Sequence, residues 1–217
     1  VFIDGEIHGA MQFGPSMVKR NTIGLVRNTA WNGFLELNRM AFGPALPPNS
    51  ESRAIAVAMR LIRKHAPHVE WVVSFSDATQ CGDGTIYRAS GFWLTQIKEN
   101  NQIWEAPNGE RFARLSLTDG QSLNIQRRAQ EIAGLNGVGG TTSMTPYKEA
   151  GFVPIPGFQL RYIYPLNDTI KDRLTVPILP YSAIDAAGAR MYKGVALSRS
   201  EAAVPPADRP CKSDQGA

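Results

Sequence analysis

A helical pattern between two strand-like segments is the feature that most limits how this chain can fold. Residues 52–64 place Ile55 and Met59 at helical spacing, which predicts an amphipathic helix. The flanking segments 33–42 and 69–76 have the aromatic and apolar patterns of strands. Because a strand, a helix and a second strand follow one another, we predict a parallel pair of strands in a layered α/β fold.

Further strand and helix signals surround this unit. We predict strands at 2–13, 92–99 and 157–166, and helices at 16–25, 84–91 and 122–135. The expected organisation is one domain over 1–197, with an insertion at about 106–157. Residues 198–217 are rich in Ala, Pro, Ser and charge, a composition typical of a disordered tail.

Composition limits the classes of protein that fit. No apolar run approaches the roughly 20 residues that span a bilayer, so we expect a cytoplasmic protein with no membrane partner. Cys81 and Cys211 lie far apart, which predicts no disulfide framework. The net charge of +4 permits a nucleic acid as partner, but ordinary solubility accounts for so small an excess equally well.

The start of the predicted helix is a candidate phosphate site. Asn49 or Ser50 is expected to cap the helix, so free backbone amides would face a ligand. The candidate cofactor-binding residues there are Asn49, Ser50, Ser52 and Arg53. The alternative is a plain helix cap beside a solvated arginine.

The loop after the second strand, "SFSDATQCGDG", is a second candidate. Ligands of α/β sheets enter at the carboxyl ends of parallel strands, where Asp77 lies. Asp77 would serve as a base, as an acceptor for an amino group, or only as a turn former. Gly82 and Gly84 would let the backbone approach a ligand. Cys81 has no histidine near it in sequence and is left out of the catalytic set.

Tyr87 and His8 complete the candidates that the residues alone suggest. A phenol at Tyr87 could donate to a departing thiolate or bind a cofactor sulfur, although a core tyrosine is the commoner case. The three histidines show no metal-ligand spacing, so the metal is unknown. His8, on the first strand, is kept as a candidate for a metal or for acid–base chemistry.

The block "WVVSFSDATQCGDGTIYRASGFWLTQIK" resembles the Mom family of phage DNA-modification proteins, as do "NGFLELNRMAF", "NSESRAIAVAMRLI" and "LRYIYPL". The similarity covers about residues 14–194. The tyrosine followed by Gly-Phe in "YRASGF" also resembles GNAT acyltransferases. The usual GNAT pyrophosphate motif is absent, and "PPNSESRAIA" stands in its place.

The resemblance implies an α/β (α+β) fold with a GNAT-like mixed central sheet flanked by helices, in which splayed parallel strands form the cofactor cleft. It implies a phage or prophage enzyme of the bacterial cytoplasm that converts adenine N6 in double-stranded DNA to N6-carbamoylmethyladenine and so protects phage DNA from restriction. On this basis Arg39, Asp77 and Tyr87 are the catalytic candidates, and Tyr87 also contacts the cofactor.

Acetyl-CoA or a related acyl donor is the expected cofactor. Simple acyl transfer would join N6 to the carbonyl carbon, so a different donor or activation of the methyl carbon, for example by iron, is required. The adenine would be flipped out of the duplex. Basic residues of the last third, or merely scattered surface charges, would grip phosphates. The DNA-binding candidates are Lys171, Arg173, Arg190 and Lys193, together with Lys148 and Arg161.

Two other functions stay open at this point. One is a conventional GNAT N-acetyltransferase that uses acetyl-CoA on a small-molecule or protein amine. The other is a DNA-binding module without catalysis. The sequence also leaves open whether the protein is a homodimer.

Overall fold

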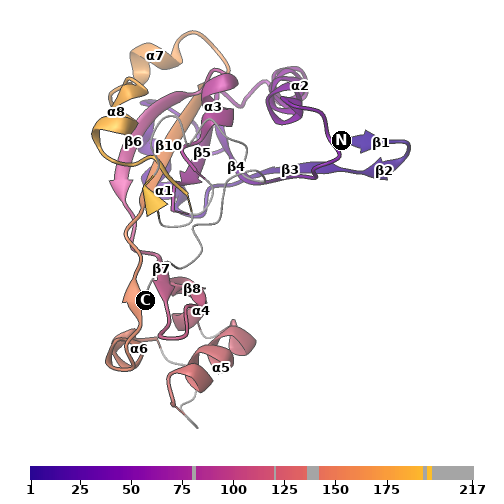
Figure 1. Cartoon of the computed structure of the whole chain (residues 1–217). Helices are drawn as coiled ribbons and strands as arrows, with labels where there is room; N and C mark the ends of the chain where they lie inside the picture. Colours follow the sequence, from indigo (N-terminus) through magenta and orange to yellow (C-terminus); the bar gives the residue numbers. More distant parts are fainter. Residues whose placement is uncertain (80–81, 120, 136–141, 193–194, 197–217) are drawn as a thin grey trace.

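The computed structural model describes residues 1–79, 82–119, 121–135, 142–192 and 195–196. Its body is a five-stranded mixed sheet (Figure 1). The strands, in spatial order, are β3 (Gly9–Gly14), β4 (Phe34–Phe42), β5 (Trp71–Asp77), β10 (Phe158–Pro165) and β6 (Trp93–Glu99). Only β4 and β5 are parallel neighbours, which confirms the predicted parallel pair within a mostly antiparallel sheet.

Helices cover both faces of this sheet. On one side, the α2 face, the core packs against α2 (Ser50–His65), α3 (Thr85–Ala89) and α8 (Ser182–Ala186). On the other side, the α7 face, a second cluster joins η1 (Ile23–Leu25) and α7 (Ile170–Arg173) to the sheet. Side chains alternate along β5, so Val72 lies in the first cluster while Trp71 and Val73 lie in the second.

The amino-terminal segment differs from the single predicted strand over 2–13. A hairpin of β1 (Phe2–Ile3) and β2 (Glu6–Ile7) precedes β3. Asp4 and Gly5 both have positive φ, 49° and 85°, as a tight turn with an Asp-Gly sequence requires. The helix predicted at 16–25 is confirmed in part, as the short α1 (Lys19–Thr22) followed by η1.

The connection between β6 and β10 forms a small unit of its own. Its sheet consists of β7 (Ile103–Glu105), β8 (Arg111–Ala113) and β9 (Val153–Pro154), and its helices are α4 (Arg114–Thr118), α5 (Leu123–Ile132) and α6 (Thr145–Glu149). We call residues 102–155 the inserted subdomain. It has a separate core of Trp104, Ala106, Phe112, Leu117, Ala129, Met144, Tyr147 and Phe152. It therefore begins slightly before the insertion predicted at about 106.

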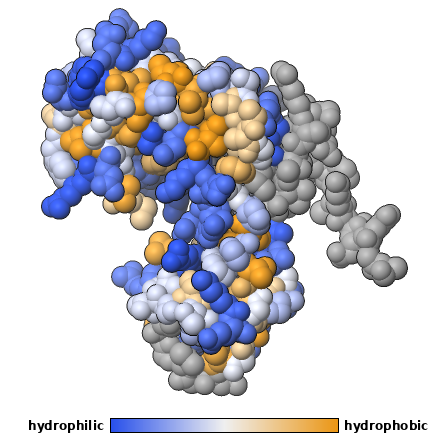
Figure 2. All heavy atoms as spheres, turned by 90° about the vertical axis from the view of Figure 1, so that its left-hand side faces the viewer, coloured by the Kyte–Doolittle hydropathy of each residue, from blue (hydrophilic) through white to orange (hydrophobic). Residues whose placement is uncertain are grey.

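The inserted subdomain and the body are joined at the point where β6 ends and β10 begins. The amide of Asn100 donates to the carbonyl of Gly157 at 2.8 Å, and that of Ala78 donates to Phe158 at 2.8 Å. Figure 2 shows the two parts as separate lobes joined by a largely hydrophilic waist. The chain ends, within the described residues, in β11 (Met191–Tyr192) and β12 (Val195–Ala196). The tail predicted over 198–217 lies outside the described residues.

Among the described residues, no helix has the length and apolar character needed to cross a bilayer.

Candidate functional site

The two parallel strands separate after a short paired segment. Backbone pairing joins β4 and β5 only at Phe34–Glu36 and Trp71–Val73. Beyond it, the Ser74 hydroxyl lies 3.4 Å from the carbonyl oxygen of Leu37 and donates to it. From there β4 pairs only with β3 and β5 only with β10. The ladder therefore opens at the carboxyl ends, where α/β sheets bind ligands.

A β-bulge at Asn38 changes which side chains of β4 face the two sides of the sheet. Gln12 of β3 is paired with Arg39, whereas the next residue is paired with Leu37, so Asn38 is the extra residue. Leu37 and Met40 both pack into the cluster on the α2 face. Arg39 is consequently placed on the opposite, α7 face, and its side chain is exposed.

The α7 face changes character along the strands. Its half nearest α7 is apolar, with Trp71, Val73 and Ile163 buried. By strand alternation and register, the half near the carboxyl ends of β4 and β5 carries charged and polar residues. We call this set the polar face, and it comprises Glu36, Arg39, Asp77, Gln159 and Arg161. It combines two carboxylates with two guanidinium groups beside the separating strands.

Arg161 is the most enclosed cation of the polar face. Its Nε donates to the Thr95 hydroxyl at 3.0 Å and its Nη2 to the Thr95 carbonyl at 3.3 Å. Burial lowers the pKa of the Arg161 guanidinium, because the charged form loses hydration. A positive charge is thus held against β6, on the same face of the sheet as Asp77.

Asp77 forms the turn that the sequence suggested as one of its roles. Its Oδ1 accepts a hydrogen bond from the backbone amide of Thr79 at 2.9 Å. The side chain is half-buried and belongs to the polar face. Turn formation occupies one of the two carboxylate oxygens.

Asp83 is a buried acid that the sequence interpretation did not single out. Its side chain is 8% exposed and lies 2.7 Å from the Arg190 guanidinium and 3.6 Å from that of Arg88. The Oδ2 contacts are not aligned as hydrogen bonds, so the attraction is chiefly coulombic. Its backbone carbonyl accepts from Tyr162 at 2.6 Å. These contacts anchor the loop before α3 to β10.

Gly84 has a steric purpose different from the predicted one. It has a φ of 70°, and a Cβ there would lie 2.6 Å from the ring of Tyr162. The close approach is therefore to a core tyrosine, and the approach of a ligand to the backbone at Gly84 stays a prediction. Burial raises the pKa of that Tyr162 hydroxyl strongly, which keeps it a hydrogen-bond donor.

Tyr87 lies on the opposite face of the sheet from Arg39 and Asp77. It is 9% exposed on α3, and its ring centroid is 5.2 Å from that of Phe92 and 5.1 Å from that of Tyr162. The structure thus brings two of the three predicted catalytic residues to one face. It packs the third into the core under α3.

The amino terminus of α2 lacks the predicted side-chain cap. Asn49 occupies the N-cap position with a φ of 66° and makes no capping hydrogen bond. The Ser50 hydroxyl donates to Pro47 at 2.7 Å and the Ser52 hydroxyl to Asn49 at 3.1 Å, so both point to carbonyls and not to amides. The Ser50 amide donates to the carbonyl of Pro47 at 3.2 Å, so the first-turn amides that stay available to an anion are those of Glu51 and Ser52, and Glu51 places a negative charge among them.

Two of the predicted DNA-binding residues lie on α7. Arg173 is held by Glu70 through two hydrogen bonds of 2.6 and 3.0 Å, and its Nε donates to the carbonyl of Arg27 at 2.8 Å. The guanidinium lowers the pKa of the Glu70 carboxyl. Lys171 is exposed. Arg173 therefore fastens α7 to the sheet, while Lys171 faces solvent.

Of the other two candidates, Arg190 is the one that lies within the described residues. Arg190 is only 12% exposed, and besides Asp83 it binds Asp185 at 2.7 Å. Its charge is thus paired inside the protein. Lys193 lies outside the described residues.

The described residues do not assemble a metal site. His8 Nε2 lies 3.8 Å from a carboxylate oxygen of Glu6, and no third ligand joins them. Within the described ranges, no three His, Cys, Asp or Glu side chains gather as a metal would require. Cys81 and Cys211 lie outside those ranges. The described residues therefore do not offer the donor set that an iron ion needs.

These features define a class of α/β protein with a mixed sheet that opens between two parallel strands, beside a charged patch at their ends. Within that class, the chain belongs to the Mom protein family, whose model matches residues 1–183. Over 93 residues it is 42% identical to "Methylcarbamoylase mom" of Escherichia phage Mu. That alignment spans 42% of this chain and 38% of the phage protein, well under half of the relative's length.

Proposed function

We propose that this protein modifies adenine N6 in double-stranded DNA to N6-carbamoylmethyladenine and thereby protects phage DNA from host restriction enzymes. Family membership over residues 1–183 is the observation that carries the proposal. The phage Mu relative, which is 42% identical to this chain over 93 residues, bears the name methylcarbamoylase. The charged patch at the open end of the sheet supports it, because both the base and its reaction partner need polar contacts there.

The polar face supplies groups suited to the adenine. Its amino group is hydrogen-bonded inside a duplex, so the nucleotide must be flipped out at a cost of a few kcal/mol. When N6 bonds to the methylene carbon of the incoming group, it loses a proton. The carboxylate of Asp77 accepts the N6 hydrogen and takes that proton. Arg39, exposed on the same face, stabilises negative charge near the reacting atoms.

The donor in this proposal is acetyl-CoA or a related acyl donor, held by a GNAT-like arrangement. The free first-turn amides of α2 and the exposed Arg53 are suited to its phosphates, whereas Glu51 weakens the fit. The donor supplies a carbon group activated for attack. A thioester alone would give an amide at N6, and acetyl-CoA itself carries no leaving group on its methyl carbon. The step balances with a related donor that brings the whole carbamoylmethyl group: N6 bonds to the methylene carbon, the leaving group on that carbon departs, and Asp77 takes the proton that N6 loses. Tyr87 contacts the donor through its hydroxyl only, because its ring is packed in the core.

A restriction assay tests this function. Plasmid DNA from cells that express the chain should resist an endonuclease whose recognition sequence contains adenine, and DNA from cells that express Asp77→Asn should be cut. If the plasmid is cut in both cases, and the purified folded protein releases coenzyme A from acetyl-CoA with an amine but no DNA, the protein is a conventional N-acetyltransferase.

A further inference from the structure

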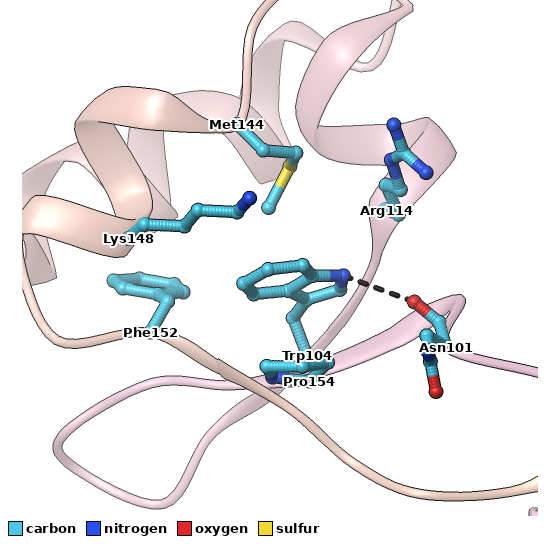
Figure 3. Close-up of a pocket in the computed structure, with 7 residues that line it drawn as sticks. All are labelled: Asn101, Trp104, Arg114, Met144, Lys148, Phe152 and Pro154. Atoms are coloured by element: carbon cyan, nitrogen blue, oxygen red, sulfur yellow. Dashed lines mark hydrogen bonds between the residues drawn. The ribbon is translucent and has the colours of Figure 1, made fainter.

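A cavity of about 450 Å³ opens in the inserted subdomain (Figure 3). Residues of α4, α6, β7 and β9 line it, together with Asn101 between β6 and β7. The cavity is therefore built by this subdomain and the segment that leads into it from β6. The lining residues are Asn101, Trp104, Arg114, Met144, Lys148, Phe152 and Pro154. Nothing in the proposed adenine chemistry uses this cavity.

The lining carries two positive charges and no negative one. Arg114 and Lys148 are both exposed, and no ion pair joins either of them to an acid among the described residues. Their neighbours behave differently, because Arg111 is bound by Glu105 at 2.9 Å and Arg128 is paired with Glu110. The cavity thus carries two cations that no acid among the described residues neutralises, and such a pair attracts an anion.

Trp104 fixes the position of one of these charges. Its indole is 6% exposed, and its Nε1 donates to the carbonyl of Asn101 at 3.1 Å. The Lys148 ammonium lies 5.7 Å from the centre of the ring, within reach of a cation–π attraction. Figure 3 shows the lysine side chain running across the indole toward Met144, with Pro154 on the other side of the ring. The ammonium is therefore held at the opening.

The second charge, that of Arg114, belongs to a different helix from Lys148. Arg114 begins α4, and its amide donates to the carbonyl of Gln102 at 2.7 Å. Lys148 is on α6, next to the fully buried Tyr147. The two cations thus stand on separate helices that one hydrophobic core positions, and Figure 3 shows them on either side of the Met144 side chain.

We propose that this cavity is a second DNA contact, in which Arg114 and Lys148 bind a backbone phosphate. The inference rests on the proposed function, because that function makes DNA the ligand. A duplex carries about one charge per 1.7 Å of its axis, so it can reach a second site besides the one that holds the flipped adenine. The donor is expected at α2, in the body, whereas this cavity belongs to a separate core. A duplex suits the cavity better for that reason.

The salt dependence of DNA affinity tests this inference. Fluorescence anisotropy with a labelled duplex of about 25 base pairs measures Kd at several salt concentrations. For the full chain with Arg114→Gln and Lys148→Gln, we expect Kd to rise roughly tenfold near 0.15 M salt and the slope of log K against log [salt] to shrink by about 1, because one phosphate contact is lost. Arg127→Gln with Arg128→Gln is the matched control, since it removes the same charge from α5 and leaves the lining unchanged. The exchange Arg114→Lys with Lys148→Arg should retain most of the affinity.

Three results would overturn the inference. One is an unchanged slope in the Arg114→Gln and Lys148→Gln protein, and another is an equal loss in the α5 control. The third is unchanged DNA binding with weakened binding of coenzyme A, which would assign the cavity to the donor's phosphates. Adenine modification is read separately in the same proteins. A wild-type chain that binds DNA through this cavity yet modifies no adenine would contradict the proposed function and leave this inference standing.

Discussion

The guanidinium of Arg190 lies 2.7 Å from the buried carboxylate of Asp83 and so joins the end of the described chain to the loop before α3. Both side chains are nearly enclosed, at 12% and 8% exposure. The energy of a charge buried at this depth depends on its partner, because water no longer solvates the charged group.

We expect Arg190→Gln to lower the free energy of unfolding by about 3 kcal/mol, since it leaves the Asp83 charge without its short contact. Urea denaturation measures this loss. The control Asp185→Asn removes the exposed partner of Arg190 and should cost less than about 1 kcal/mol. A variant with wild-type stability but weaker DNA binding would show that Arg190 contacts DNA, as the sequence suggested.

The pair of Glu70 and Arg173 gives the fold a defined acid sensitivity. The pKa of Glu70 is lowered in the folded state, chiefly by its hydrogen bonds to Arg173. The pair therefore stabilises the fold fully above the ordinary carboxyl pKa of 4.5, and this contribution is lost as the pH falls through the lowered value. Thermal unfolding between about pH 3 and pH 6 should show a steeper loss for wild type than for Glu70→Gln. Parallel curves for the two proteins would contradict this account.

Gly157 is required where the inserted subdomain meets the body. A Cβ at this position would lie 1.7 Å from the Thr79 hydroxyl oxygen, which is closer than any real contact. We expect Gly157→Ala to destabilise the protein by roughly 1–3 kcal/mol. Adding Thr79→Ala should recover part of the loss. Gly24→Ala is the control, since a Cβ there has open space. Equal stability of both glycine variants would refute the close approach.

Asp77→Asn separates the two roles of Asp77. An asparagine oxygen can still accept from the Thr79 amide, so the turn is kept, but it cannot take a proton. We expect unchanged thermal stability and a loss of adenine modification of about 10²- to 10⁴-fold. Asp168→Asn, at an exposed loop position, should modify DNA normally. If Asp77→Asn is fully active, the carboxylate serves the turn alone.

Local patterns were sufficient to predict most of the elements. The periodicity of Ile55 and Met59 predicted α2, and the apolar run before Asp77 predicted β5, because both are set by the alternation of buried and exposed positions. The parallel pair followed from their order. The continuous strand at 2–13 was wrong because the Asp4–Gly5 turn, with both φ values positive, breaks it into a hairpin.

The candidate site was harder to predict, since its geometry depends on contacts between distant segments. The bulge at Asn38 decides the face on which Arg39 lies, and no local pattern reveals it. The roles of Asp83 and Arg190 depend on a pairing between residues far apart in the chain. The spacing of Asp77 and Tyr87 suggested one site, whereas the buried ring of Tyr87 belongs to the opposite face of the sheet.

Mass spectrometry of nucleosides tests the central claim most directly. Plasmid DNA from cells that express the wild-type chain would be digested and compared with DNA from cells without it. The account predicts a new deoxyadenosine derivative whose mass is increased by one carbamoylmethyl group in place of a hydrogen, with fragmentation that places it on the base. Unmodified deoxyadenosine from cells that contain well-folded protein would contradict the proposed function.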